Sequence, residues 1–468
     1  MLLSSSSYFV FLVAIFFLYW PVARIRALAL AAILFANYFF YAKWDLFYLF
    51  LIPAASTVDF LIGLGLARFQ HAALRRSLAG LSVLWNAGLL ATLKYTPFVL
   101  ENWSAVTGGA KPEWHWSFPI GLSFYCFQSL TYTLDLYRKD AKATHSYLAY
   151  LAAVSFFPTT LAGPITRVSS LLTQFEKKDK SLSIEDGGRA VFLIALGLMK
   201  KMLIADYLGA NLVNRIFDFP NLYSGFEVLI GVYGYALQLY YDFSGYTDIA
   251  LGSALMLGIK LPPNFKMPYA AENIADFWRR WHISLSNWLR DYLYFSLPGL
   301  RSKWKIFTYT NLVLTMAIGG LWHGPSWTFV VWGLLHGAAL ALTRAWQNWR
   351  GTQSNPAWWA RLWRTFATVH FVAFAWIFFR AASLDTAWQI VNRIASFTFS
   401  AGNISAPVAI VMAIAALAHY IPDAWFQTTD RLFVRAPFYV QAAAMALLLL
   451  AIHYVNATGA APFIYTRF

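Results

Sequence analysis

The sequence predicts an all-α, multi-pass membrane protein, and three observations lead to that fold class. The chain of 468 residues is 59% hydrophobic and only 12% charged, whereas a soluble globular protein carries about 25% charged residues. Its hydrophobic residues gather in windows that reach or approach the length of a membrane-spanning helix. Aromatic residues, 19% of the chain, repeatedly flank these windows, as they do at the two interfaces of a bilayer.

The apolar windows indicate roughly 10–12 spans packed as one bundle. Buried helices of a soluble protein can be equally apolar, but so many in one chain make that reading a poor one. The remaining polar stretches are short, so we expect a single integral membrane domain over residues 1–468 and no soluble domain. The clearest windows are residues 8–20, 27–41, 46–66, 191–198, 312–321 and 442–454.

The net charge of +15 arises largely from basic residues in short loops between the windows. Cytoplasmic loops of membrane proteins have this composition, so the charge indicates topology and contact with lipid rather than binding to nucleic acid. The expected topology places the N-terminus and residues 101–116 outside. The basic loop residues are Arg24, Arg26, Arg68, Arg75, Arg76, Arg138, Lys139, Lys142, Lys177, Lys178 and Lys180.

Two segments do not read as simple spans. Residues 156–164 are apolar but contain two prolines and a glycine, which suits a re-entrant loop buried in protein or an interfacial turn. Residues 274–294 carry too many charges for a lipid-facing helix and are expected to form interfacial helices. We find no internal repeat, which weighs against a transporter built on inverted repeats.

A histidine stands at a helix break in one of the apolar runs. His323 follows Trp322 and precedes Gly324 and Pro325, and a proline cannot continue the helical hydrogen bonding. Ionisable groups at membrane depth are costly and read as functional by default. A neutral imidazole can act as a general base near pH 7. The alternative is a structural histidine that binds a carbonyl freed at the break.

Two further histidines are weaker candidates. His282 follows Trp281 within the charged interfacial segment, where an interfacial histidine without a catalytic role is at least as natural. An uninterrupted helix would place His336 about 220° around the axis from His323, although the break makes that count unreliable. We therefore expect His336 to support packing or the surroundings of the site.

Charged residues near these histidines have two open readings. Arg279, Arg280 and Arg290 could receive the phosphates of an anionic ligand by bidentate pairing, or they could pair with nearby carboxylates and fix the interfacial helices. The carboxylates in question are Asp242, Asp248 and Asp291. Other polar residues inside spans are expected to join helices to one another: Asp59, Asn86, Gln128 and Asp135.

Several chemistries find no support in the sequence. Cys126 is the single cysteine, so an intrachain disulfide is impossible and a cysteine metal cluster is excluded. A metal held by His282 and His323 would need a third ligand that the sequence does not supply, so no metal site is predicted. The motifs of P-loop enzymes, dinucleotide-binding enzymes, zinc proteases and α/β-hydrolases are missing.

Taken together, the motifs resemble those of the membrane-bound O-acyltransferase family, over roughly residues 30–395. The likeness is strongest to its bacterial branch of alginate O-acetyltransferase membrane subunits, with the teichoic acid D-alanyl transferases as more distant relatives. It includes Arg-Trp-His at 280–282 and Trp-His-Gly at 322–324. The other matching segments are residues 119–125, 127–129, 161–167, 242–248, 276–284, 290–294 and 378–381.

The resemblance implies a fold and a set of roles. The family fold is a ring of tilted helices around a tunnel that opens to both membrane faces. The histidine of Trp-His-Gly is regarded as catalytic in the family, which carries over to His323. The histidine of Arg-Trp-His is the second functional position, which carries over to His282, expected to orient the donor or polarise its carbonyl. Trp281 is expected beside the donor, and Trp322 beside the catalytic histidine.

The expected function is acetyl transfer at a bacterial inner membrane for O-acetylation of an exported, alginate-like polysaccharide. The resemblance implies acetyl-CoA as a cytoplasmic thioester donor, no permanently bound cofactor, and a separate periplasmic SGNH-type acetyltransferase as partner. Alternatives in the same chemistry are O-acetylation of peptidoglycan or another envelope glycan and D-alanyl transfer to teichoic acid. An alternative of another class is a transporter or a scaffold of an export complex.

Overall fold

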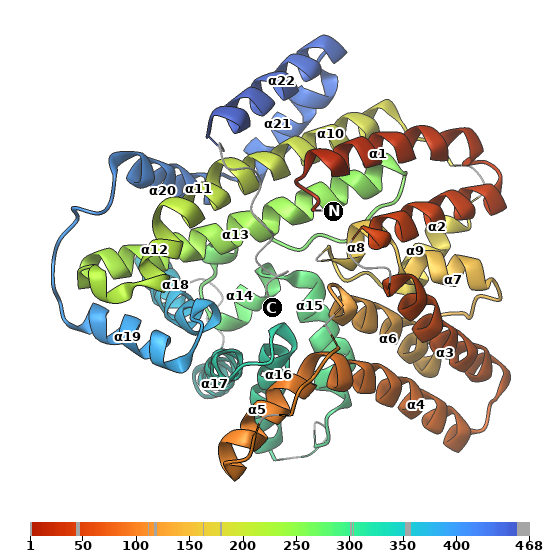
Figure 1. The fold of residues 1–468 in the computed structure, drawn as a ribbon, viewed down its shortest axis with the longest axis horizontal. Helices are drawn as coiled ribbons and strands as arrows, with labels where there is room; N and C mark the ends of the chain where they lie inside the picture. Colours follow the sequence, from red (N-terminus) through yellow and green to blue (C-terminus); the bar gives the residue numbers. More distant parts are fainter. Residues whose placement is uncertain are drawn as a thin grey trace. The chain divides into compact units, whose positions relative to one another are not determined.

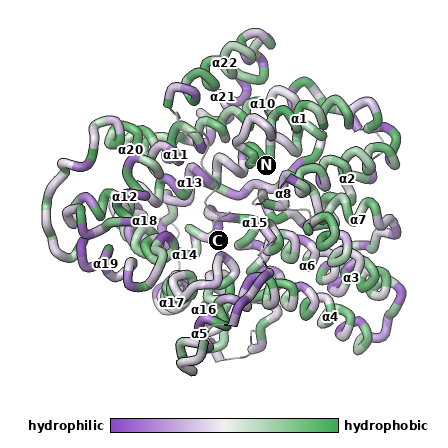
Figure 2. The backbone as a smooth tube through the Cα atoms, viewed as in Figure 1, coloured by the Kyte–Doolittle hydropathy of each residue, from purple (hydrophilic) through white to green (hydrophobic). Residues whose placement is uncertain are grey.

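The computed structural model describes residues 2–43, 47–110, 112–116, 119–161, 163–177, 180–299, 302, 304–351 and 357–455. Every regular element in these ranges is helical, which confirms the all-α prediction (Figure 1). Hydrophobic residues occupy most of the length of many helices (Figure 2). Leu46, Ala162 and Lys178, which belong to segments discussed above, lie outside the described residues.

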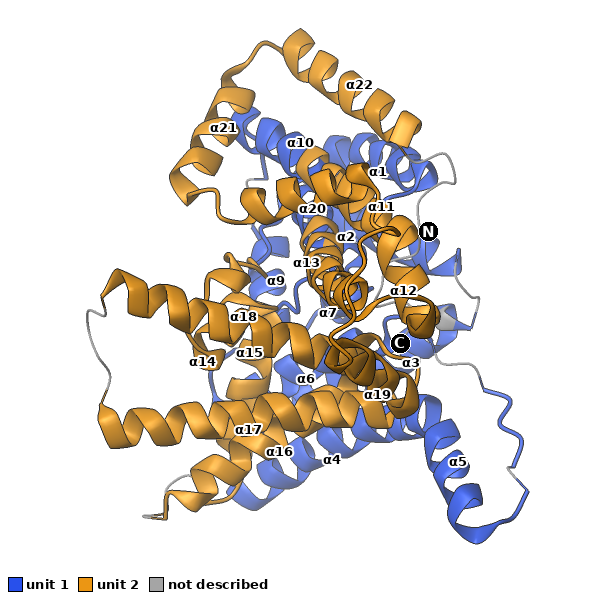
Figure 3. Ribbon diagram, turned by 90° about the vertical axis from the view of Figure 1, so that its left-hand side faces the viewer, with its two compact units in different colours: residues 1–194, 247–262 blue, residues 195–246, 263–468 orange. Residues whose placement is uncertain are grey.

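The chain divides into two compact units (Figure 3). Unit 1 comprises residues 1–194 and 247–262, and unit 2 comprises residues 195–246 and 263–468. The helices of unit 1 are α1 (Ser6–Tyr19), α2 (Arg26–Ala42), α3 (Tyr48–Arg68), α4 (Ala72–Leu90), α5 (Thr96–Thr107), α6 (Leu122–Arg138), α7 (Tyr147–Val154), α8 (Phe157–Thr160), α9 (Val168–Phe175) and most of α10 (Ile184–Leu198).

Unit 2 contains the remaining helices and most of α13 (Gly225–Met256), a helix of 32 residues. Before it come a π-helical turn η3 (Met199–Ala205), α11 (Asp206–Leu208), η4 (Gly209–Val213) and α12 (Asn214–Asp218). After it come α14 (Ile274–Arg280), α15 (Ile283–Trp288), η7 (Leu289–Leu293), η8 (Tyr294–Ser296), α16 (Ile306–His323), α17 (Trp327–Arg350), α18 (Trp358–Arg380), α19 (Leu384–Ala395), α20 (Ala406–His419), α21 (Asp423–Arg435) and α22 (Phe438–Val455).

Four described helices are long and apolar enough to cross a membrane: Leu49–Arg68 of α3, α17, α18 and α22. The pair α20 and α21, bent by 97°, could supply a fifth span, and two shorter apolar helices cover Ser6–Val22 and Arg26–Ala42. The protein is therefore polytopic. The count is lower than the roughly 10–12 spans predicted. Windows 191–198 and 312–321, for example, belong to α10 and α16, which are not among the helices counted.

Helices α16 and α17 form a tight antiparallel hairpin. Glycines on both helices allow the close approach: a Cβ at Gly333 would lie 3.0 Å from Ala317 Cα, and a Cβ at Gly337 would lie 2.7 Å from Val313 Cα. Small residues bring membrane helices together in this way. The chain reverses at Gly324, where Ser326 caps α17 by accepting a hydrogen bond from Thr328 N.

The two segments that did not read as spans are short and well packed. Residues 156–161 are buried, and α8 occupies four of them, as expected for apolar backbone enclosed by protein. Residues 274–296 form four short helical pieces instead of one long helix. The first break in this segment falls at Trp281 and His282, which brings this pair into the centre of the site.

Candidate histidine site

His282 occupies a strained position between α14 and α15. Its φ angle is +43°, a left-handed conformation that a residue with a Cβ rarely adopts. A neighbouring loop holds it there, since Ile283 N donates to Asn264 O at 2.9 Å and Lys266 N donates to Arg280 O at 2.9 Å. Strain of this kind persists only where surrounding structure enforces it, and it is common at functional sites.

The Asn264 side chain supports the same histidine. Its Oδ1 accepts from Ser284 N at 3.1 Å and from Ser284 Oγ at 2.8 Å, and it lies 3.2 Å from His282 Nδ1. Both side chains are buried, with Asn264 only 1% exposed. Burial lowers the pKa of His282 to about 3, so its imidazole is neutral at physiological pH. Sequence reasoning missed Asn264 because an asparagine in a polar loop carries no distinctive pattern.

His323 is the last residue of α16, where the helix ends at Gly324. Its side chain is buried among aromatic rings. Ring centroids lie 5.0 Å away at Trp322, 5.1 Å at Trp332 and 5.1 Å at Phe379. The helix break at Gly324 therefore leaves the imidazole at the end of α16, buried in unit 2.

One aromatic cluster connects all three histidines. The Trp322 ring contacts the rings of both His323 and His282, the latter at 6.4 Å. The Trp332 ring lies 5.1 Å from His323 and 5.0 Å from His336. His336 is thus not turned away from His323, because the chain reverses between α16 and α17 and the count of about 220° for a continuous helix does not apply.

Trp278 and Trp281 extend this cluster from the α14 side. Trp278 Nε1 donates to His336 Nδ1 at 3.3 Å. Trp281 is buried and stacks on Phe277 at 5.7 Å with an interplanar angle of 14°. Trp281, which was expected beside the donor, therefore lies among the rings that pack around the histidines.

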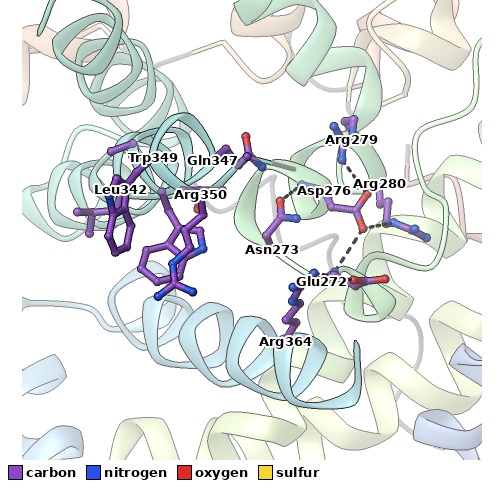
Figure 4. A pocket seen from close by; sticks show the side chains of 14 residues that line it. Glu272, Asn273, Asp276, Arg279, Arg280, Leu342, Gln347, Trp349, Arg350 and Arg364 are labelled. Carbon is purple, nitrogen blue, oxygen red and sulfur yellow. Dashed lines mark hydrogen bonds and ion pairs between the residues drawn. The ribbon is translucent and has the colours of Figure 1, made fainter. Parts of the chain in front are cut away.

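Arg279 and Arg280 line a cavity of about 1090 Å³, here named the basic cavity (Figure 4). Both arginines bind Asp276, at 3.3 Å and 2.9 Å. Arg350 at the end of α17 lies over the rings of Trp346 and Trp349, at 5.0 Å and 4.9 Å. The lining residues are Glu272, Asn273, Asp276, Arg279, Arg280, Leu342, Thr343, Ala345, Trp346, Gln347, Trp349, Arg350, Gly351 and Arg364.

Four arginines against two acids give the basic cavity an excess of positive charge. Such a cavity suits a ligand that carries several negative charges, because guanidinium groups bind phosphates in bidentate fashion. Two of the arginines that line it, Arg350 and Arg364, were not singled out from the sequence. They come from two further helices, α17 and α18, and only the fold brings them to Arg279.

Arg290 does not line the basic cavity. It forms an ion pair with Asp291 at 2.8 Å, one of the pairings considered from the sequence, and it borders a second pocket of about 320 Å³. The three arginines are thus divided between two cavities, because the helix break at Trp281 and His282 separates α14 from α15 and η7. Asp276, which holds the first two arginines, was not among the expected partners.

Asp242 takes part in a buried ion cluster that the sequence did not suggest. Lys201 Nζ, in the π-helical turn η3, lies 2.6 Å from Asp242 Oδ1 and 2.6 Å from Asp206 Oδ1. All three side chains are less than 7% exposed. Lys201 comes three residues after the apolar window 191–198 and reads as a loop lysine in the sequence. Asp248, six residues later in the same motif, belongs to unit 1.

In the ranges that the structure describes, no group of three or more histidine, cysteine, aspartate or glutamate side chains comes together as metal ligands. The arrangement in unit 2 instead gathers three buried imidazoles among aromatic rings, and the same unit holds a cavity rich in arginine. Fold and site together define a multi-pass membrane protein with a buried histidine centre.

Comparison with known proteins makes the assignment specific. The model of the membrane-bound O-acyltransferase family matches residues 36–385, and the chain belongs to that family. It is an O-acyltransferase and a multi-pass membrane protein. The matched range agrees with the roughly 30–395 expected from the motifs.

Three relatives illustrate the range of the family. The chain is 40% identical over 403 residues to a probable alginate O-acetylase AlgI of Azotobacter vinelandii, covering 84% of this chain and 78% of the relative. It is 36% identical over 383 residues to a peptidoglycan O-acetyltransferase of Helicobacter pylori, covering 76% and 72%. It is 29% identical over 278 residues to a teichoic acid D-alanyltransferase of Bacillus subtilis, covering 56% and 68%.

Proposed function

We propose that this protein is an inner-membrane acetyltransferase that moves an acetyl group from acetyl-CoA for O-acetylation of an exported, alginate-like polysaccharide. The observation that carries the proposal is the pair His323 and His282, whose rings both contact one buried tryptophan, Trp322, in an O-acyltransferase. Similarity of about 40% to alginate O-acetylases supports the polymer class.

The chemical step is assigned to His323. As a general base, its imidazole takes the proton of an acceptor hydroxyl, and the oxygen attacks the carbonyl carbon of the thioester. A new C–O bond forms and the C–S bond breaks. The protonated His323 then returns the proton to the departing thiolate, so the histidine is regenerated and no other reactant is consumed.

The basic cavity is the proposed place for the anionic part of the donor. Arg279 and Arg280 line it, and the phosphates of acetyl-CoA carry the opposite charge. The helix ends around it, at the start of α16, the end of α17 and the start of α18, carry Lys305, Arg344, Arg350, Arg361 and Arg364. An excess of basic residues marks the cytoplasmic side, where acetyl-CoA is available.

A second candidate function is O-acetylation of peptidoglycan, which the relative in Helicobacter pylori favours. Both functions place the acceptor outside the cytoplasm. In either case we propose that a separate periplasmic SGNH-type acetyltransferase passes the acetyl group to the polymer. Analysis of surface glycans with and without this protein separates the two, since only the true acceptor loses its acetyl esters.

The test of the activity is His323→Ala in purified protein supplied with labelled acetyl-CoA and a hydroxyl acceptor. Removal of a general base lowers turnover by a factor on the order of 10²–10⁴. His453→Ala, which changes an exposed histidine on α22, is the matched control and should keep wild-type turnover. Near-normal turnover of a folded His323→Ala protein would remove the assignment, and absence of any turnover in the wild type would favour a transporter or scaffold.

The proposed topology is tested by thiol labelling on intact cells. Arg75, a natural choice from the sequence, is unsuitable because it is buried and donates to Leu136 O and Tyr137 O. Exposed Arg76 replaces it. In a Cys126→Ala background, an impermeant reagent should label Thr107→Cys and leave Arg76→Cys unlabelled. The reverse pattern would invert the topology.

A further inference from the structure

The contacts of Asn264 determine which nitrogen of His282 carries the proton. The Ser284 backbone N–H can only donate, so the Asn264 atom that faces it must be the oxygen Oδ1. His282 Nδ1 lies 3.2 Å from that same oxygen. Two acceptors do not form a hydrogen bond, so Nδ1 must carry the hydrogen. A neutral imidazole has one N–H, and the lone pair of His282 is therefore on Nε2.

We infer that Asn264 is a positioning residue that fixes His282 as a hydrogen-bond acceptor at Nε2. An Nε2 lone pair receives an N–H or O–H group of the donor or acceptor substrate. It does not donate to the thioester carbonyl, so of the two roles expected for His282 the geometry favours orientation and disfavours polarisation of the carbonyl. This inference rests on the proposed acyl transfer.

The surroundings of His282 agree with a fixed, neutral ring. Phe243 of α13 contacts it edge-on at 4.7 Å, and Trp322 of α16 covers another side. The titratable side chains in the same aromatic cluster are His323, whose ring also contacts Trp322, and His336, which contacts His323's neighbour Trp332. Asn264 also binds both groups of Ser284, so its amide cannot turn over without loss of those two hydrogen bonds.

Three variants test the inference, each checked by a melting curve. Asn264→Leu removes the acceptor and should lower kcat on the order of 10²-fold with little change in KM. This loss is smaller than the roughly 10⁴-fold loss seen when a carboxylate that fixes the tautomer of a catalytic histidine is replaced. Ser284→Ala keeps the acceptor and should stay within about threefold of wild type.

Asn264→Asp separates positioning from simple packing. The carboxylate still accepts from Nδ1, so most activity should return, but its negative charge favours the imidazolium and raises the pKa of His282. The acid limb of the pH–kcat profile should then move to higher pH. Wild-type kcat in a folded Asn264→Leu protein, or an Asn264→Asp profile identical to wild type, would overturn the inference. Loss of acetyl transfer in every protein, wild type included, would instead contradict the proposed function.

The second pocket carries an independent inference. It lies between α15–η8 and the α16–α17 hairpin, and its walls are mostly apolar, with Leu289, Leu312, Met316 and Leu340 among them. Thr315 also lines it, is 6% exposed, and its Oγ1 has no hydrogen-bond partner among the described residues. Arg290 and Arg344 stand at the same pocket.

These features together indicate what kind of molecule the pocket would bind. It would have an apolar chain, a polar group where that chain begins, and a negatively charged group beyond the polar group. We propose that the pocket binds one anionic phospholipid of the cytoplasmic leaflet, with an acyl chain against the leucines, an ester oxygen at Thr315 and the phosphate at the two arginines. The ion pair with Asp291 uses Nε of Arg290, and a guanidinium has four further N–H donors. Basic pockets between membrane helices bind anionic headgroups in this way.

Native mass spectrometry on protein in phosphatidylglycerol or phosphatidylcholine tests the proposal. We expect one retained phosphatidylglycerol, and about fivefold weaker retention in Arg344→Gln, whose exposed side chain is not needed for folding. Lys305→Gln is the matched control, because Lys305 lies at the start of α16 and does not line the pocket. Leu340→Trp should fill the pocket and displace the lipid.

Equal retention of phosphatidylcholine, or equal loss in Arg344→Gln and Lys305→Gln, would overturn the lipid site. Displacement of phosphatidylglycerol by acetyl-CoA would also overturn it, since the pocket would then belong to the donor. Inorganic phosphate should have no effect, because it lacks the chain that the leucines contact. The readout is binding, so it stands whether or not acetyl transfer is observed.

Discussion

Two buried polar groups, one in each unit, differ in how they use their hydrogen-bonding atoms. In unit 1 the Asp59 carboxylate accepts from Ser82 Oγ at 2.6 Å, Asn86 Nδ2 at 2.8 Å and Ser129 Oγ at 2.7 Å. These partners come from α4 and α6, so the network joins three helices. Satisfied networks of this kind make a buried core rigid and specific.

The histidine cluster of unit 2 is built differently. Its members touch mainly through ring faces and edges, and within the described ranges the Nε2 of His336 and the Nε1 of Trp332 have no hydrogen-bond partner. Because His336 Nδ1 accepts from Trp278, its hydrogen is on Nε2. Buried donors left in this state are costly, which suits a region that receives a polar substrate.

The comparison predicts its largest effect on stability at Asp59. Asp59→Ala leaves three buried donors without their acceptor and should lower the free energy of unfolding on the order of 3 kcal/mol or more. The melting temperature in detergent measures this loss of stability. Asp59→Asn keeps one acceptor oxygen, so its melting temperature should lie between those of the wild type and Asp59→Ala. Turnover per folded molecule should be retained. Lost turnover at an unchanged melting temperature would show that unit 1 also holds catalytic groups.

A smaller effect is expected at the basic cavity. Arg280→Ala should raise KM for acetyl-CoA about tenfold with little change in kcat, because uniform donor binding is lost, and the difference should shrink at high salt as charges are screened. Asp276→Asn breaks the same ion pair without removing the cation, so it should leave KM nearly unchanged. If both variants only lower the melting temperature, the arginine is structural.

Arg431→Ala on α21 is the exposed control for the loss of one positive charge. It does not line the basic cavity. Its KM should therefore equal that of the wild type at every salt concentration, and a rise there would attribute the effect to net charge rather than to the cavity.

Much of this arrangement could be predicted from the sequence, because membrane residues obey strong rules. Apolar windows predicted an all-α fold, and polar residues inside them predicted helix-joining contacts such as those of Asp59 and of Gln128, which donates to Ala153 O at 2.7 Å. The family motifs marked His282 and His323. Each of these inferences needs only local composition or a contiguous motif.

The remainder depends on how the chain turns. The reversal at Gly324 brings His336 to the same tryptophan as His323, and the break at His282 sends Arg279 and Arg290 to different cavities. Asn264 contacts His282, which lies 18 residues away in the sequence. Lys201 lies in a π-helical turn and pairs with Asp242 of another helix. No periodicity or spacing reveals such contacts, so they became visible only in the structure.

A further effect is expected from pH and bears directly on the contrast between the units. Burial lowers the pKa of His282 to about 3, below its ordinary value of about 6.5 in the unfolded chain. As the pH falls, the unfolded state therefore binds a proton at His282 before the folded state does. The stability gained from a neutral His282 is fully present above about pH 6.5 and is lost as the pH falls toward 3.

The melting temperature should fall between pH 7.5 and 5. It should fall less steeply in His282→Gln, because glutamine cannot titrate there. All other residues are the same in both proteins, so the difference between the slopes isolates His282. Equal slopes would mean that His282 is charged or solvated in the folded protein, and the buried histidine centre would lose its contrast with the Asp59 network.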